Sequence, residues 1–194
     1  MTVIKRLMVF PALILILFIG EAHVSKAFNV HHDLIKSAQL KTSQDLIASS
    51  DLIILAEIQG VSYQFNTGRH TDIGKFINYV QPLSVKTVYK GSEQHDVHLL
   101  TTGIYPLPKP ENPLNNLYPG AIENGTYLTF LKKIPGTPYY QLNGGWQGLY
   151  PLINGRTFAL SGGFTRFNDL APKDINHIIK TRNGEFFSIK ISII

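Results

Sequence analysis

Short runs of alternating residues, separated by Gly and Pro, constrain the fold of this 194-residue chain more than any other feature. In a strand, successive side chains point to opposite faces, so a period of two indicates a strand with two distinct faces. Many short strands joined by Gly and Pro turns predict a mainly β fold, either a small barrel or a sandwich. The clearest runs are "DLIILAEI" (51–58), "LSVKTVYK" (83–90), "HDVHLL" (95–100) and "TYLTFLKK" (126–133).

Turn residues support this interpretation. Asn154-Gly155 lies between two apolar runs and predicts a tight hairpin, because both residues of such a turn adopt positive φ. Pro82 cannot donate to a strand ladder, so it predicts an edge, a bulge or the start of a strand. Val88, which shares a face with two lysines, indicates a local bulge or an edge. We expect polar connections at 66–76 and an extended, proline-rich loop at 104–120.

Helical spacing occurs near each end of the chain. Apolar residues before position 51 predict a helix over roughly 43–50, with Thr42 or Ser43 as its N-cap. A second helix is predicted to begin near Pro172 and to stop at Asn183-Gly184. The tail at 185–194 fits either a last strand or a poorly ordered end.

The N-terminus has the pattern of a secretory signal peptide. Lys5 and Arg6 precede an uncharged apolar run at 8–20, and Ser25 and Ala27 stand at the −3 and −1 positions of a cleavage site. The apolar run is shorter than the ~20 residues of a spanning helix, which favours cleavage over anchoring. We expect a signal peptide at 1–27 and a secreted or cell-wall-associated protein. Cleavage after Ala22 and retention as an anchor remain open.

Beyond the signal peptide, the length suits one domain. We expect an N-terminal extension at 28–42, an OB-like barrel at 43–168, and a C-terminal helix and tail at 169–194. The chain contains no cysteine, which excludes disulfides and a lipid-modified cysteine anchor. The net charge of +5 is dispersed. A mildly basic surface could favour anionic wall polymers, whereas nucleic-acid binding would need a concentrated basic stripe.

Signatures of catalysis and of metal binding are weak. No Gly-x-Ser-x-Gly motif occurs, and no pair of carboxylates has a spacing that indicates acid–base chemistry. An enzyme would need a pocket that gathers His70, Glu57 or Asp72. His31 and His32, or His23 after cleavage at Ala22, could join a terminal amine around a metal. We expect no catalytic residue, no metal and no cofactor.

Aromatic residues of the second half are the better indication of a binding surface. They lie in or beside loops and short strands, where they could form a platform for carbohydrate, peptide or nucleic acid, or close the ends of a small barrel. We predict binding by Tyr105, Tyr118, Trp146 and Tyr150.

Four segments resemble, in order and spacing, the OB-fold barrel of the tissue inhibitors of metalloproteinases and of netrin-like modules. They are "SSDLIILAEIQGV", "LSVKTVYKGS", "VHLLTTG" and "PGAIENGTYLTFLKK". The chain is also similar to small secreted proteins of Bacillus-like bacteria, which have a strand comparable with Trp146-Gln147-Gly148. The resemblance covers about residues 43–165 and implies a small OB-like antiparallel β-barrel with a short N-terminal helix and a C-terminal helix. The animal inhibitors bind the protease zinc through an N-terminal cysteine, which this chain lacks.

Together these features predict a secreted, monomeric, non-enzymatic binding module. Its partner would be a protein or an anionic cell-wall polymer, without nucleic acid and without a stable membrane span after signal cleavage. A secreted protease inhibitor and a hydrolytic enzyme are the alternatives.

Overall fold

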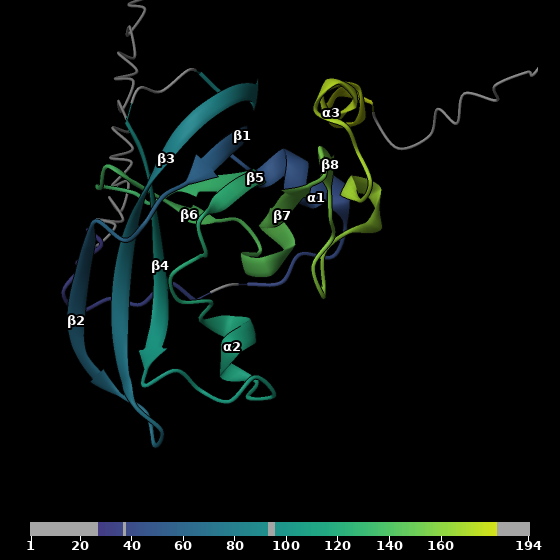
Figure 1. The fold of residues 1–194 in the computed structure, drawn as a ribbon. Helices are drawn as coiled ribbons and strands as arrows, with labels where there is room; N and C mark the ends of the chain where they lie inside the picture. The colour runs from purple at the N-terminus through teal and green to yellow at the C-terminus, as the bar shows by residue number, and fades with distance from the viewer. Residues whose placement is uncertain (1–26, 37, 93–95, 182–194) are drawn as a thin grey trace, which may run out of the picture.

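The computed structural model describes residues 27–36, 38–92 and 96–181 (Figure 1). The fold is mainly β, as predicted: eight strands form one mixed sheet, with short helices near both ends. Residues 1–26 of the predicted signal peptide, including His23, and the tail at 185–194 lie outside the described residues. Within the described ranges, no helix has the length and apolar character needed to cross a bilayer. The elements are α1 (Ser43–Ser49), β1 (Leu52–Ile58), β2 (Tyr63–His70), β3 (Lys75–Lys90), β4 (Val97–Tyr105), α2 (Leu114–Leu117), β5 (Gly125–Lys133), β6 (Tyr139–Leu142), η1 (Gly145–Gly148), β7 (Leu149–Ile153), β8 (Arg156–Thr157), η2 (Thr165–Phe167) and α3 (Pro172–Lys180).

Five strands close into a ring in the order β1-β3-β4-β6-β5, and β5 pairs back to β1. All these pairs are antiparallel except β4–β6, which is parallel and joins His98 to Tyr139 and Leu99 to Tyr140. The prediction of a purely antiparallel sheet was therefore wrong at this pair. The chain leaves β4 and returns to it only after α2 and β5, and such a long connection permits a parallel neighbour.

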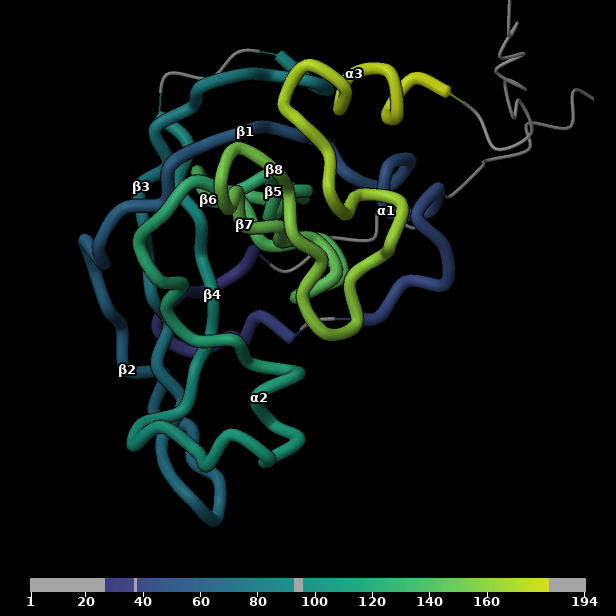
Figure 2. Tube along the Cα trace, turned by 45° about the vertical axis from the view of Figure 1, so that its right-hand side comes forward, coloured from purple at the N-terminus to yellow at the C-terminus, as the bar shows by residue number. Residues whose placement is uncertain are grey.

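Beyond the ring, β3 and β4 continue and take β2 as a third strand (Figures 1 and 2). We call this part the arm (residues 63–80 and 100–105). β2 pairs only with β3, so β2 is the edge strand. The arm projects from the ring on the side away from α3 in both views.

The arm corrects two predictions. The segment at 66–76 is not a polar connection, because β2 runs to His70 and β3 begins at Lys75. Pro82 does not start a strand but lies inside the 16-residue β3. It is tolerated because β3 changes neighbours at this point. Residues up to Val80 pair with β2, and residues from Leu83 onward pair with β1. The missing N–H therefore falls between two ladders.

The bulge predicted near Val88 is confirmed. The β1–β3 register shifts between Ile53 and Ile54 and again between Leu55 and Ala56. A bulge reverses which face the following residues occupy. Val88 therefore packs with the ring interior, while Tyr89 packs with the cluster on the other side. Strict alternation along 83–90 would place Tyr89 on the same inner face as Leu83, and the bulge moves Tyr89 to the other face.

Buried apolar residues form three clusters. The first fills the ring and includes Ile54, Leu99 and Leu131. The second lies outside β1 and β5, under α1, η2 and α3, and contains the rings of Phe130, Tyr150 and Phe167 in edge-on and tilted contact. The third lies between the arm and the N-terminal segment. The ring therefore has a packed interior, and the arm has a small core of its own.

Local signals placed both helices and the hairpin correctly. Thr42 and Asp45 form a reciprocal capping box at the start of α1. Asn154 and Gly155 have φ of 51° and 77° in the turn between β7 and β8. Pro172 is the first residue of α3. This helix ends at Lys180, with an extended Thr181 after it, three residues before the stop predicted at Asn183-Gly184.

Candidate functional site

An open pocket of about 430 Å³ lies on one face of the arm. We call it the arm pocket. Side chains from all three strands of the arm line it: Gln64, Asn66, Lys75, Ile77, Tyr79 and Tyr105.

Strand register places these residues on one face. Gln64 lies opposite Tyr79, Asn66 opposite Ile77, and Lys75 opposite Tyr105. Side chains two residues apart on a strand share a face, so the three pairs form three successive rows. Lys75 and Tyr79 are four residues apart on β3, which is about 13 Å along an extended strand. The arm pocket is therefore long enough for an extended ligand.

Two glycines shape the pocket. Gly103 lies opposite Ile77 in the middle row, and a Cβ on it would stand 2.6 Å from the Cα of Gly120 and 3.0 Å from the Tyr79 ring. A Cβ on Gly74, in the β2–β3 turn, would stand 2.6 Å from the backbone oxygen of Tyr105. Both 2.6 Å separations are shorter than real Cβ contacts allow, so a larger residue at Gly103 would displace Gly120 and the Tyr79 ring, and one at Gly74 would displace the end of β4.

The polar groups of the pocket are mostly without protein partners. Within the described part of the chain, the side chains of Gln64, Tyr79 and Tyr105 make no hydrogen bond to the protein. The Asn66 Oδ1 accepts from the Gly68 N–H at 3.1 Å, which leaves the Asn66 Nδ2 available. The ammonium of Lys75 lies 5.5 Å from the centre of the Tyr105 ring, a cation–π contact.

The ionisation of Tyr79 suits a donor role. Burial, and to a smaller extent the neighbouring Tyr105, raises the pKa of Tyr79. Its hydroxyl therefore stays protonated at neutral pH and can donate a hydrogen bond as well as accept one.

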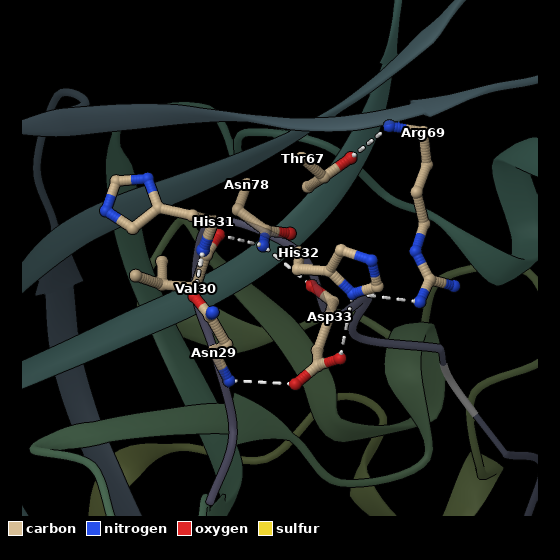
Figure 3. Close-up of polar contacts among 8 residues, drawn as sticks. All are labelled: Asn29, Val30, His31, His32, Asp33, Thr67, Arg69 and Asn78. Atoms are coloured by element: carbon tan, nitrogen blue, oxygen red, sulfur yellow. Dashed lines mark hydrogen bonds and ion pairs between the residues drawn. The ribbon is translucent and has the colours of Figure 1, made fainter.

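The opposite face of the arm is covered by the N-terminal segment at 28–35 (Figure 3). The buried Asn78 donates from Nδ2 to the carbonyl oxygens of Val30, at 2.8 Å, and Asp33, at 2.9 Å. Thr102 Oγ1 donates to Asn78 Oδ1 at 2.5 Å and accepts from the Ile35 N–H at 2.8 Å. These bonds dock the segment on the sheet.

The two histidines of this segment also have partners. The His32 Nδ1 lies 3.2 Å from Arg69 Nη2 and 3.4 Å from Asp33 Oδ1, and the His31 ring packs edge-on against Phe65 (Figure 3 shows the histidines). Among the residues that the structure describes, no group of three or more His, Cys, Asp or Glu side chains could hold a metal.

The four aromatic residues predicted to bind do not form one surface. Tyr105 is 60% exposed and lines the arm pocket. The Tyr118 ring packs against Phe76 with 4.8 Å between ring centres. The half-buried Trp146 donates from Nε1 to the carbonyl oxygen of Asn115 at 2.9 Å. Tyr150 is 0% exposed, in the aromatic core, so it presents no surface to a ligand.

The predicted candidates for catalysis are likewise separated. Glu57 on β1 forms an exposed ion pair with Lys86, 3.2 Å apart. His70 belongs to the outer row of the arm, opposite Lys75. Asp72 is exposed in the β2–β3 turn. The arm pocket, which none of these three residues lines, offers hydrogen-bonding groups, an aromatic ring and one lysine.

Sequence reasoning missed Gln64, Asn66, Lys75 and Tyr79. The signal was present in "YQFN" at 63–66, where two aromatics alternate with two amides. That alternation is typical of a strand with one apolar and one polar face. The bulge at Gly68, with φ of 70°, and the polar turn that follows interrupt the alternation, so the segment was interpreted as a polar connection.

Comparisons with known proteins found no relative of this chain. No protein-family model matches the chain, no curated protein matches it, and no solved structure matches it.

Proposed function

We propose that this chain is an exported, non-enzymatic binding module whose ligand, a cell-wall polymer or a protein, occupies the arm pocket. One observation carries the proposal: Gln64, Tyr79, Tyr105 and Lys75 converge on an open pocket, and none of them hydrogen-bonds to the rest of the described protein. Of these four, Lys75 and Tyr79 are half-buried, where polar groups are usually paired within a protein, whereas Gln64 and Tyr105 are exposed. Side chains that remain unpaired on one concave surface are therefore candidates for ligand contacts.

The strand connectivity supports an OB-like barrel as the scaffold. An OB fold is a five-stranded, partly open Greek-key barrel. The ring order β1-β3-β4-β6-β5, with β5 returning to β1, agrees with such a barrel if β2 is taken as an insertion between its first two strands. OB folds bind ligands on their second and third strands. Those strands would be β3 and β4, the two that extend into the arm.

Export is proposed from the N-terminal sequence: basic residues, an apolar run and a small-x-small site ending at Ala27. N-terminal sequencing of protein collected from the culture medium tests it. Phe28 is expected as the first residue. A chain that stays in the cell with Met1 in place would contradict export.

Capture of ligands tests the binding proposal. The full-length protein is immobilised and exposed to a cell-wall fraction and to spent medium, beside the variants Tyr105→Ala and Tyr63→Ala. These tyrosines are matched, at 60% and 63% exposed, but Tyr63 points to the other face of the arm. Loss of capture only with Tyr105→Ala supports the proposal. Equal capture by all three proteins contradicts it.

Protease inhibition is the second candidate, and one observation favours it. Leu107 is 83% exposed, and Pro106 and Pro108 flank it in the loop after β4. Prolines reduce the conformational freedom that a loop loses when it enters an active-site cleft. A panel of serine proteases and metalloproteases tests this candidate. Inhibition that Leu107→Gly removes would support it, and no inhibition by the wild-type protein would exclude it.

A further inference from the structure

The arm pocket has an unbalanced charge. Lys75 is the only ionisable residue of the pocket lining whose side chain is charged at neutral pH, and no carboxylate lines the pocket. Among the described residues, Lys75 makes a cation–π contact with Tyr105 and no ion pair. An ammonium in a concave site without a counter-charge attracts an anionic group. Charge complementarity therefore indicates an acidic ligand.

The remaining lining residues suit a ligand rich in hydroxyl groups. Gln64 and Asn66 each offer an amide, which can donate and accept at neighbouring positions. The protonated Tyr79 hydroxyl adds a further donor and acceptor. Only Ile77 contributes an aliphatic side chain, and it is buried in the floor. A pocket of this composition satisfies many polar groups and buries little apolar surface.

Tyr105 supplies a flat surface at one end of the pocket. Its side chain is 60% exposed, and it lies in the row of Lys75, next to the row of Ile77. A tyrosine ring is amphipathic and can pack against the C–H face of a sugar while its hydroxyl remains hydrated. The neighbouring ammonium would then meet an acidic substituent of the same sugar.

Other polymers match less well. An extended peptide is usually recognised through the backbone of a sheet edge, whereas the arm pocket is formed by side chains on a face of the sheet. A nucleic acid strand requires a basic groove that follows its phosphates, and this pocket contains one lysine.

We infer that the arm pocket binds an acidic saccharide chain, with a sugar ring on Tyr105, its acidic group at Lys75, and hydroxyl groups of the adjoining sugars at Gln64, Asn66 and Tyr79. This inference rests on the proposed binding function and specifies its ligand. The three rows of the pocket contact successive parts of the chain, so affinity rises from a monosaccharide to a short oligomer.

An array of defined glycans tests the inference. Uronate-, sulfate- and phosphate-bearing oligosaccharides are presented beside the same oligosaccharides with the acid esterified or removed, and inorganic polyphosphate provides charge without sugar. The full-length protein is expected to bind at least one acidic form about fivefold more tightly than its neutral counterpart, as one exposed charge pair allows. Binding to polyphosphate is expected to be weaker.

Variants assign the effect to residues. Lys75→Gln is expected to remove the preference for the acidic form and to keep binding of the neutral form. Tyr105→Ala is expected to weaken both forms about tenfold, the size of a well-formed aromatic contact. Tyr63→Ala and Lys173→Gln are the controls, since Tyr63 lies on the other face of the arm and the exposed Lys173 lies on α3. Neither control is expected to change binding.

Three outcomes would overturn the inference: equal affinity for acidic and neutral forms, polyphosphate binding as tight as the best glycan, or no glycan bound at all. If no glycan binds but Tyr105→Ala abolishes capture of a protein from spent medium, the saccharide inference fails and the proposed binding function stands. If Tyr105→Ala changes no capture of any kind, both fail.

Discussion

The two faces of the arm are made by the same three strands, yet they use their polar residues in opposite ways. On the covered face, Asn78 and Thr102 are buried, and their side chains hold the N-terminal segment. On the open face, Gln64 and Tyr79 lie opposite each other and make no hydrogen bond to the described protein. Alternate residues of one strand therefore serve folding and, in our proposal, ligand contact. Burial and pairing, not residue type, separate the polar groups that hold the fold together from those proposed to bind a ligand.

The largest effect should come from the covered face. Asn78→Ala removes the hydrogen bonds that the buried Asn78 side chain makes to the carbonyl oxygens of Val30 and Asp33 and to the Thr102 hydroxyl. We expect a loss of about 3 kcal/mol in the free energy of unfolding, because buried unpaired polar groups are costly. Urea denaturation measures it. Gln64→Ala, on the open face, is the control and should change stability by less than about 0.5 kcal/mol. Equal losses for both variants would remove the distinction between the faces.

A smaller loss is expected at Gly103, where the two roles meet. Gly103→Ala places a methyl group 2.6 Å from the Cα of Gly120 and 3.0 Å from the Tyr79 ring, so backbone and ring must both move. We expect about 2 kcal/mol of destabilisation, together with weaker ligand binding, because the pocket wall shifts. Gly60→Ala is a suitable control, since nothing lies within 4 Å of its added Cβ. Unchanged stability of Gly103→Ala would contradict this account, because it would mean that Gly120 and the Tyr79 ring move at no cost.

Tyr150 and Tyr105 extend the comparison beyond the arm. The buried Tyr150 hydroxyl accepts a hydrogen bond from the Phe164 N–H at 2.9 Å. Tyr150→Phe should cost about 1 kcal/mol of stability through loss of this bond and leave ligand binding unchanged. Tyr105→Phe should leave stability unchanged, because its hydroxyl has no partner within the described protein. Denaturation and binding measured on both variants check this. A loss of binding with Tyr150→Phe would return that residue to the list of binding candidates.

The same tyrosine has a predicted effect that appears at high pH alone. Burial raises the pKa of Tyr150 above its ordinary value, so the protonated form favours the folded state. That contribution is complete below the unfolded-state pKa of about 10 and is lost as the pH rises beyond it. The free energy of unfolding should therefore fall above pH 10, less steeply in Tyr150→Phe than in the wild-type protein. Identical slopes would contradict this account.

The sequence alone predicted those parts of the fold that local chemistry determines. Thr42 and Asp45 cap α1, Asn154-Gly155 forms the β7–β8 turn, and the bulge near Val88 occurs, because each depends on a few neighbouring residues. Pro82 could not be placed from the sequence. Its missing N–H is harmless only because β3 changes partners at that point, and the partners are distant in the chain.

Of the candidate site, the sequence yielded Tyr105 alone. Tyr150 has the same residue type and also lies near turns, but the rings of Phe130 and Phe167 enclose it. Which tyrosine is enclosed depends on packing between distant elements, and no local pattern reports it. Gln64 was missed because the alternation around it is brief and ends at the Gly68 bulge.

Mapping of ligand contacts by NMR tests the central claim most directly. Isotope-labelled full-length protein is titrated with the acidic oligosaccharide that binds most tightly, and the shifts of both faces of the arm are followed. The account predicts that the largest side-chain shifts occur at Gln64, Tyr79 and Tyr105, while Asn78 and Thr102 on the covered face hardly change. Largest shifts on the covered face, or around Leu107 with the arm pocket unaffected, would contradict it.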